Sequence, residues 1–251
     1  MSGARPVVLV TGGSRGIGAA VCRLAASRGY DVALTYESNA AAADAVVTDC
    51  AASGARAEAF KSDAGNPAAI EALFREIDKR FGRLDALINN AGIVGRASPL
   101  IQADPVMIAR CIEVNVTGAM LIAREAVKRM AKSLGGRGGA IVNLSSAAAT
   151  LGGPGDFVWY AASKGAIDSF TIGLGKEVAG DGIRVNAVAP GIIETEIHAS
   201  AGYPDRVKQV APQLPMRRAG SADEVAETIL FLMSEASSYV AGVTLRVAGG
   251  R

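Results

Sequence analysis

Short apolar runs rich in valine, isoleucine and alanine alternate along the chain with longer segments whose apolar residues recur at helical spacing. The short runs predict strands at residues 7–10, 32–36, 55–61, 86–88, 140–144, 184–188 and 244–247. The longer segments predict helices at residues 17–28, 40–52, 67–81, 105–132, 159–179 and 222–234. Alternation of this kind is typical of a parallel sheet with helices on both faces.

Right-handed crossovers between these strands predict one α/β domain over residues 1–251, with a doubly wound, seven-stranded parallel sheet. Asn66, Asp104 and Ser221 stand where N-caps are expected. A ligand crevice is expected beyond the carboxyl ends of the strands. Residues 192–218 break the rhythm of strands and helices, with helix-like pieces separated by prolines. This tract is either a flap over the crevice or a plain surface connection.

The composition excludes several classes of protein. The formal charge of +2 comes from interspersed acids and bases, so we expect neither a nucleic-acid partner nor a membrane surface. No apolar run reaches membrane-spanning length, and residues 6–10 are too few for a signal sequence. Three scattered cysteines suit a reducing compartment, so a cytoplasmic protein is expected. With His198 as the single histidine, no metal site is expected.

A glycine-rich turn follows the first predicted strand and opens the first helix, with the sequence TGGSRGIG at residues 11–18. Glycines there let a diphosphate approach the backbone, and the helix N-terminus supplies unpaired N–H groups and a positive dipole end. The spacing G-x-x-x-G-x-G differs from the commoner dinucleotide fingerprint G-x-G-x-x-G. Its place between a strand and a helix still favours dinucleotide binding.

Tyr160 and Lys164 lie four residues apart, on one face of a predicted helix. A free tyrosine has a pKa near ~10, so a tyrosine that exchanges protons near neutral pH needs a neighbour that stabilises its ionised form. The ammonium of Lys164 is expected to do this. Taken alone, such a pair is more often an ordinary solvated helix face.

Together, several ordered motifs resemble the short-chain dehydrogenase/reductase family, in particular its 3-oxoacyl-[acyl-carrier-protein] reductase and glucose 1-dehydrogenase-like group. The resemblance spans nearly the whole chain. It rests on residues 11–18, the NNAG segment 89–92, Asn115, Ser145-Ser146, Tyr160 with Lys164, Pro190-Gly191 and Gly249-Gly250. It implies a Rossmann-type fold, a nicotinamide cofactor and the residue roles that follow.

By this resemblance, Tyr160 exchanges a proton with the substrate oxygen, while Lys164 lowers its pKa and holds the nicotinamide ribose. Ser146 hydrogen-bonds the same oxygen, although the adjacent Ser145 competes for this role. Asn115 holds a water in a relay that connects Lys164 to solvent. The protein supplies orientation and proton transfer, and the cofactor supplies the redox step.

The resemblance also assigns cofactor contacts, with Asp63 and Ala64 in the adenine pocket and Asn89, Gly92, Ile193 and Thr195 around the nicotinamide. The full predicted set is Gly12, Ser14, Arg15, Gly16, Ile17, Gly18, Thr35, Tyr36, Ser38, Asp63, Ala64, Asn89, Ala91, Gly92, Tyr160, Lys164, Pro190, Gly191, Ile193 and Thr195.

The choice between NADP and NAD turns on the end of the second strand, where an acidic residue would pair with the ribose of NAD. That position is Tyr36, and Arg15 is able to meet a 2′-phosphate, with Thr35 and Ser38 as further donors. NADP is therefore favoured. Glu37 is the residue that argues for NAD.

The leading hypothesis is an NADP-dependent oxidoreductase acting on a small-molecule carbonyl or secondary alcohol, assembled as a homotetramer. One alternative is a catalytically silent dinucleotide-binding regulatory or scaffold protein. Another is an NAD-preferring alcohol or sugar dehydrogenase. His198 is either a surface group of the flap or a substrate contact, and Phe157 and Trp159 either line the substrate mouth or pack.

Overall fold

The computed structural model describes residues 5–251 and contains one seven-stranded sheet. All of its strand pairs are parallel, in the order β3-β2-β1-β4-β5-β6-β7. The strands are β1 Val7–Val10, β2 Asp31–Tyr36, β3 Ala57–Lys61, β4 Ala86–Asn89, β5 Gly139–Leu144, β6 Ile183–Pro190 and β7 Thr244–Val247. The predicted fold class is confirmed. The third strand begins two residues later than predicted.

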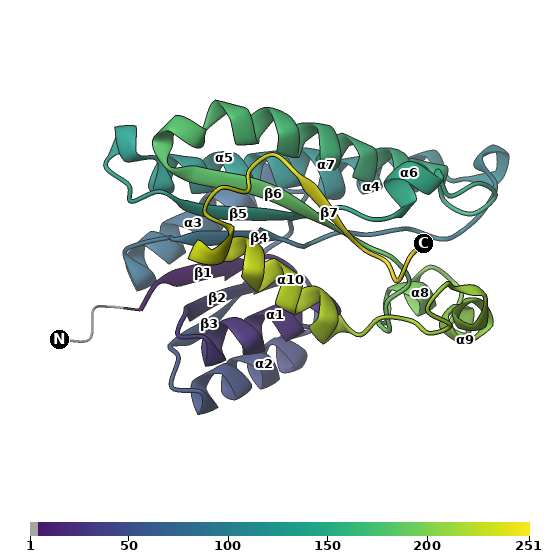
Figure 1. Cartoon of the computed structure of the whole chain (residues 1–251), viewed down its shortest axis with the longest axis horizontal. Coiled ribbons are helices and arrows are strands. Elements are labelled where there is room, and N and C mark those ends of the chain that lie inside the picture. Colours follow the sequence, from purple (N-terminus) through teal and green to yellow (C-terminus); the bar gives the residue numbers. More distant parts are fainter. Residues whose placement is uncertain (1–4) are drawn as a thin grey trace.

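Helices cover both faces of the sheet (Figure 1). One layer consists of α1 Gly16–Ser27, α2 Ala40–Ala52 and α10 Ala222–Met233. The other consists of α3 Pro67–Phe81, α4 Pro105–Ile112, α5 Ala119–Met130 and α7 Val158–Glu177. The predicted N-caps are confirmed, since the side chains of Asn66, Asp104 and Ser221 each accept a backbone N–H of the following helix.

The alternation of strand side chains explains why two cores form. In β1, Val8 and Val10 pack with α1, α2 and α10, whereas Val7 and Leu9 pack with α3 and α5. Successive strand residues point to opposite faces, so a strand covered on both sides must be apolar throughout. β1 is buried at all four positions.

The predicted helix 105–132 is interrupted. A π-helical turn, Glu113–Gly118, separates α4 from α5, and α5 ends at Met130 because Ala131 is extended. At Gly118 a Cβ atom would lie 1.8 Å from the Ala64 carbonyl oxygen, so only glycine allows this approach. The continuous stretch Pro105–Met130 is long and apolar enough to cross a membrane by length and composition, contrary to the sequence-based expectation. In this fold its second half, α5, packs on the sheet through Ile122, Ala123, Ala126 and Met130.

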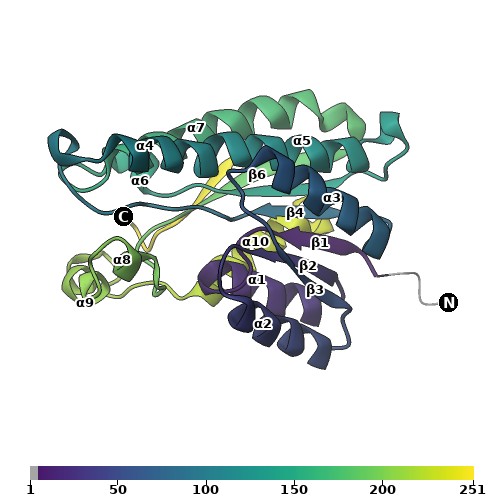
Figure 2. The ribbon, with the colours of Figure 1, turned by 180° about the vertical axis from the view of Figure 1, so that it is seen from behind.

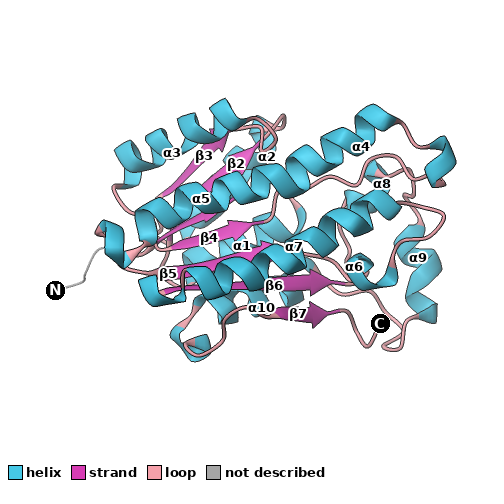
Figure 3. Cartoon of the chain, turned by 90° about the horizontal axis from the view of Figure 1, so that it is seen from above, coloured by secondary structure: helices cyan, strands magenta, loops and turns pink. Residues whose placement is uncertain are grey.

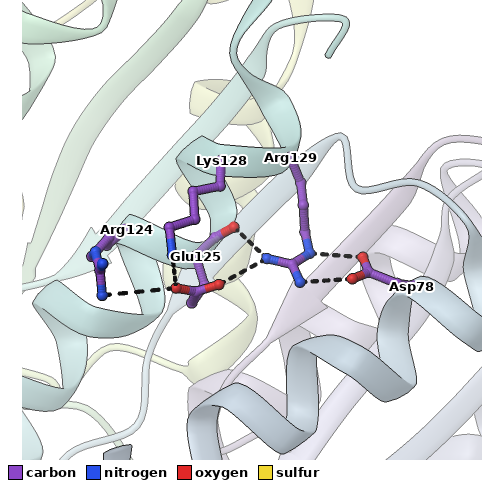
Figure 4. Close-up of polar contacts among 5 residues, drawn as sticks. All are labelled: Asp78, Arg124, Glu125, Lys128 and Arg129. Atoms are coloured by element: carbon purple, nitrogen blue, oxygen red, sulfur yellow. Dashed lines mark hydrogen bonds and ion pairs between the residues drawn. The ribbon is translucent and has the colours of Figure 1, made fainter. Parts of the chain in front are cut away.

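Ion pairs join α3 to α5 on the outside of this layer (Figure 4). The Arg129 guanidinium donates to both carboxylate oxygens of Asp78, at 2.7 and 2.6 Å, and to Glu125 at 3.0 Å. It also lies 4.8 Å from the centroid of the Phe74 ring. Because the ring is fully buried, this arginine fixes how α5 sits over α3.

The strand order reverses between β1 and β4, which opens a crevice at their carboxyl ends. The strands point toward the end of the molecule that carries α6 Ala148–Leu151, α8 Ile197–Ser200 and α9 Arg206–Val210 (Figure 3). The last two helices belong to the predicted flap and project beyond the sheet (Figure 2). A parallel bridge between Ile193 and Gly220 closes the base of this flap.

Candidate active site

The glycine-rich turn after β1 ends in a helix terminus with free N–H groups. Gly12 and Gly16 adopt left-handed conformations, with φ of 64° and 52°, which favour glycine. No side chain caps α1, whereas Asn39, Asn66 and Ser221 cap α2, α3 and α10. The N–H groups of the first turn of α1 are therefore available to an anion.

Two of the predicted cofactor residues, Thr35 and Gly18, support the conformation of this turn. The Thr35 side chain is almost fully buried and accepts the Gly12 N–H at 3.0 Å, so its hydroxyl holds the loop. At Gly18, a Cβ atom would lie 2.3 Å from the Gly12 carbonyl oxygen. Gly18 does not line the cavity, and its role is to let α1 pack against the turn.

Asn89 and Asn90 lie differently with respect to the cavity. The buried Asn89 amide donates to the Ala119 carbonyl at 2.8 Å and does not line the cavity, so its contact with a cofactor stays a prediction. Asn90, which the prediction omitted, lines the cavity and donates to the carbonyls of Thr11 and Gly12 at 2.8 and 3.1 Å. The NNAG segment was the signal, and the pleat of β4 decides which asparagine faces the cavity.

Tyr160, Lys164 and Ser146 meet beside the carboxyl ends of β4 and β5. Tyr160 and Lys164 come from α7, with the Lys164 Nζ 5.7 Å from the centroid of the Tyr160 ring. The Lys164 ammonium donates to the Leu144 carbonyl at 2.6 Å. This contact holds the lysine against the end of β5, next to the serine pair.

The structure separates the two candidate serines. Ser145 is buried, and its hydroxyl donates to the Lys164 carbonyl at 3.3 Å. Ser146 is half-buried and accepts the Ala148 N–H at 3.1 Å. Both serines line the cavity, but the Ser145 hydroxyl is bonded to the backbone of α7, whereas Ser146 lies close enough to the Tyr160 phenol to oppose the rise in its pKa. This geometry favours Ser146 for contact with a substrate oxygen.

Burial governs the protonation of the catalytic pair. It raises the pKa of Tyr160 to about 12, although the hydrogen bond with Ser146 opposes the rise. Burial also lowers the pKa of Lys164 to about 8. The expectation that Lys164 lowers the pKa of Tyr160 is not met in this arrangement. Loss of hydration disfavours the charged form of each group.

Asn115 lies in the π-helical turn and is fully buried. Its amide donates to the Ile93 carbonyl at 2.8 Å and to Ser163 Oγ at 3.0 Å, while its carbonyl oxygen accepts the Ile93 N–H at 2.8 Å. The side chain therefore positions the loop after β4 and does not line the cavity. A role in a proton relay stays a prediction.

One cavity of about 1210 Å³ contains both the glycine-rich turn and the catalytic side chains. It exceeds the ~300–1,000 Å³ usual for a small-molecule site, so it has room for a dinucleotide and a substrate together. All predicted site residues line it except Gly18, Asn89 and Asn115. The predicted lining residues are Gly12, Ser14, Arg15, Gly16, Ile17, Thr35, Tyr36, Ser38, Asp63, Ala64, Ala91, Gly92, Ser146, Tyr160, Lys164, Pro190, Gly191, Ile193 and Thr195.

The far end of the cavity, beside the ends of β2 and β3, is charged. Arg15, Glu37 and Asp63 line it. Asp63 accepts the Gly65 N–H at 2.8 Å and a guanidinium N–H of Arg110 at 2.5 Å. Burial raises the pKa of Asp63, but these two hydrogen bonds outweigh it and hold the pKa below its ordinary value. Arg110 comes from α4, and no local sequence pattern predicts its place at this site.

At the opposite end, the flap contacts the loop before α7. Asp156 accepts hydrogen bonds from Arg206 and from the Tyr203 hydroxyl, each at 3.0 Å. The Arg206 guanidinium lies 5.2 Å from the centroid of Phe157, whose ring meets that of Tyr160 edge-on at 5.8 Å. Residues 192–218 are thus connected through side chains to Tyr160.

The remaining candidates also have defined places. His198 is half-buried on the flap and lines the cavity, and burial lowers the pKa of its imidazole, with Arg206 acting in the same direction. Phe157 lines the cavity. Trp159 is buried and donates its indole N–H to the Val94 carbonyl at 2.8 Å, so it packs behind the site.

These features fit a nicotinamide dinucleotide. The uncapped N-terminus of α1 suits a diphosphate. At Gly12 and Gly18 the backbone lies too close to neighbouring atoms to admit a side chain, so no side chain at these positions blocks the diphosphate. At the other end, a phenol, a hydroxyl and an ammonium converge where a reacting carbonyl would need proton donors.

Comparison with known proteins agrees with this architecture. A family model described as enoyl-(acyl carrier protein) reductase matches residues 12–251. The Escherichia coli (strain K12) protein named uncharacterized oxidoreductase YgfF is 49% identical over 245 residues, covering 98% of this chain and 99% of that protein.

Solved structures are similar over nearly the whole chain as well. A short-chain dehydrogenase from Burkholderia cenocepacia J2315 in complex with NADP has a TM-score of 0.89 at 34% identity, covering 98% of this chain and 97% of that one. A 3-ketoacyl-(acyl-carrier-protein) reductase from Brucella melitensis complexed with NADH has a TM-score of 0.90 at 30% identity, covering 98% of each chain.

Proposed function

The chain belongs to the short-chain dehydrogenase/reductase family of oxidoreductases, and we propose that it transfers a hydride between NADP(H) and a small-molecule carbonyl or secondary alcohol. One observation carries the proposal. A single cavity joins the uncapped N-terminus of α1 to Ser146, Tyr160 and Lys164. A fold alone does not fix a function, so the argument rests on this site.

The nicotinamide cofactor, when bound, supplies or accepts the hydride. Tyr160 donates a proton to the substrate oxygen in carbonyl reduction, because a phenol with a pKa of about 12 is protonated at neutral pH. Ser146 donates a hydrogen bond to the same oxygen and fixes its position. Lys164 holds the ribose and, in its charged form, stabilises the tyrosinate as it forms. Asn115 positions the loop after β4 beside these groups.

The cofactor would lie along the cavity from Asp63 to the catalytic end. Asp63 and Ala64 would border the adenine, the first turn of α1 would bind the diphosphate, and Ile193 and Thr195 would border the nicotinamide. Arg15 is exposed at the adenine end, which supports NADP through charge-assisted hydrogen bonds to a 2′-phosphate. NAD is the alternative, which Glu37 supports.

The proposal extends to the molecule as a whole. One domain would carry cofactor site and catalytic residues, with residues 192–218 as a lid over the substrate. Assembly as a homotetramer would use α5 and α7, where Met120 and Ile172 are partly exposed and Gly165 and Gly173 leave open space for a close neighbour. A cytoplasmic location suits the three free, buried cysteines.

The decisive experiment measures oxidation of NADPH and of NADH, by absorbance, with a panel of ketones, β-keto esters and diketones. Turnover of at least one carbonyl that is lost in Tyr160→Phe would support the function. If both cofactors bind and no carbonyl or alcohol is turned over, the silent regulatory or scaffold protein becomes the better hypothesis.

A further inference from the structure

Three carboxylates from different parts of the chain converge on one guanidinium. Arg110 of α4 lies 2.5 Å from Asp63, 3.5 Å from Glu113 and 3.7 Å from Glu37. Asp63 follows β3, Glu37 follows β2, and Glu113 lies one turn further along the same helical stretch. Arg110 therefore ties α4 to the adenine end of the cavity.

Arg110 acts from behind the cavity wall. Asp63 and Glu37 line the cavity, whereas Arg110 does not. Among the described residues of this end, Arg15 is a cation without an ion pair, and Arg23 is paired with Asp49 at 2.7 Å. With Glu113 included, Arg15 and Arg110 face three carboxylates, so this end has a net negative charge, and without Arg110 that charge would be one unit more negative.

The local sequence is built to admit this contact. A Cβ atom at Gly65 would lie 2.2 Å from Arg110 Nη1, so the guanidinium crosses directly over that glycine. The Gly65 N–H donates to the same Asp63 oxygen that Arg110 contacts. Glycine at this position allows arginine and aspartate to meet, and both bonds keep Asp63 ionised.

We propose that Arg110 shifts cofactor preference toward NADP by partly offsetting the charges of Asp63 and Glu37, so that the adenine end accepts a ribose carrying a 2′-phosphate more readily. This inference rests on the proposed binding of a nicotinamide dinucleotide in the cavity. Arg15 attracts the phosphate directly, while Arg110 reduces the repulsion that the two carboxylates exert. It also accounts for Glu37, the residue that argued for NAD in the sequence.

The expected effect differs between the two cofactors. NADPH carries a phosphate near this end and NADH does not, so only NADPH responds strongly to an added net negative charge. At the effective dielectric constant of a protein surface, removing one cation near the doubly charged 2′-phosphate changes the affinity of the protein for NADPH by about tenfold. Arg110→Met should therefore raise the ratio of the dissociation constants, NADPH over NADH, by about tenfold.

The test uses calorimetric titration of the whole protein with each reduced cofactor, so it does not depend on knowing the substrate. Arg110→Lys keeps the charge and should keep most of the wild-type ratio. Glu37→Gln in the Arg110→Met background should move the ratio back toward wild type. Gly65→Ala displaces the guanidinium from another direction and should raise the ratio as Arg110→Met does. Higher salt should reduce each shift.

Arg28→Met is the matched control, because Arg28 is paired with Glu227 on the surface and does not line the cavity. Its ratio should stay within about twofold of wild type, since charges beyond a Debye length are screened. Equal weakening of NADPH and NADH in Arg110→Met would overturn the inference and leave Arg110 as a structural support. The wild-type ratio tests the proposed NADP preference separately, because the shift is predicted whichever cofactor the wild type prefers.

Discussion

Replacing each serine of the pair that follows β5 by alanine separates catalysis from packing. Ser146 lines the cavity beside Tyr160, so in the proposed mechanism Ser146→Ala removes a hydrogen-bond donor to the substrate oxygen. Loss of one such donor typically lowers kcat by about 10²–10³-fold, or about 2.7–4 kcal/mol of transition-state stabilisation. The Ala148 N–H also loses its acceptor, at a cost to stability of about 1 kcal/mol.

Ser145→Ala should show the opposite balance. Its hydroxyl makes a long, 3.3 Å hydrogen bond to the Lys164 carbonyl inside α7, which is worth about 0.5–1.5 kcal/mol of stability. Turnover should fall by no more than about threefold, because the tyrosine and the substrate oxygen keep their donors.

The assay compares kcat at saturating NADPH with the free energy of unfolding in urea for both variants. The ratio of the two losses in kcat is the informative quantity, since both changes remove one hydroxyl from adjacent residues. A larger loss of kcat in Ser145→Ala would refute the assignment of Ser146. Equal losses would show that the pair acts through the position of α7 and not through contact with the substrate.

Three further predictions concern proton transfer and the lid. Tyr160→Phe should lower kcat by at least ~100-fold while NADPH affinity stays near wild type, and near-native turnover would contradict the mechanism. The value of kcat/KM for NADPH should fall as the pH rises above about 8, because Lys164 loses its charge there, and Lys164→Met should abolish this fall. Amide hydrogen exchange across residues 192–218 should slow when NADPH binds. Arg206→Ala should accelerate this exchange in the free protein, because it breaks the contact with Asp156. Unchanged exchange in both experiments would show that residues 192–218 are a static connection.

The sheet was predictable because its strands are buried on both faces. Val7–Val10 is apolar at every position, which is typical of a parallel strand covered by helices on both faces. The π-helical turn was not predictable, since it depends on the close approach of Gly118 to Ala64, more than fifty positions apart in the chain. Apolar spacing continues through it, so the pattern predicts one unbroken helix.

Some features of the site were likewise predictable from the sequence, and others were not. The motif that contains Asn89 and Asn90 located the cavity, but which of the two faces it depends on the pleat of β4. The contacts of Arg110 with Asp63 and of Arg206 with Asp156 join segments about fifty residues apart. Neither pair has a local sequence signal, because charged residues at such separations are common and only the folded chain selects partners.

The protonation of Tyr160 and Lys164 sets how the rate of the proposed reaction should depend on pH in each direction. A cation lowers the pKa of a phenol only as far as it approaches the phenolic oxygen, and the Lys164 ammonium is bonded to Leu144 beside the ring. Tyr160 thus keeps its proton at neutral pH, as carbonyl reduction requires. Alcohol oxidation needs the tyrosinate. At pH values below the pKa of Tyr160, the tyrosinate fraction increases about tenfold for each unit by which the pH is raised. In the proposed mechanism, proton donation by Tyr160 is therefore available for reduction near pH 7, and the rate of oxidation should increase as the pH rises, until the loss of charge on Lys164 opposes it.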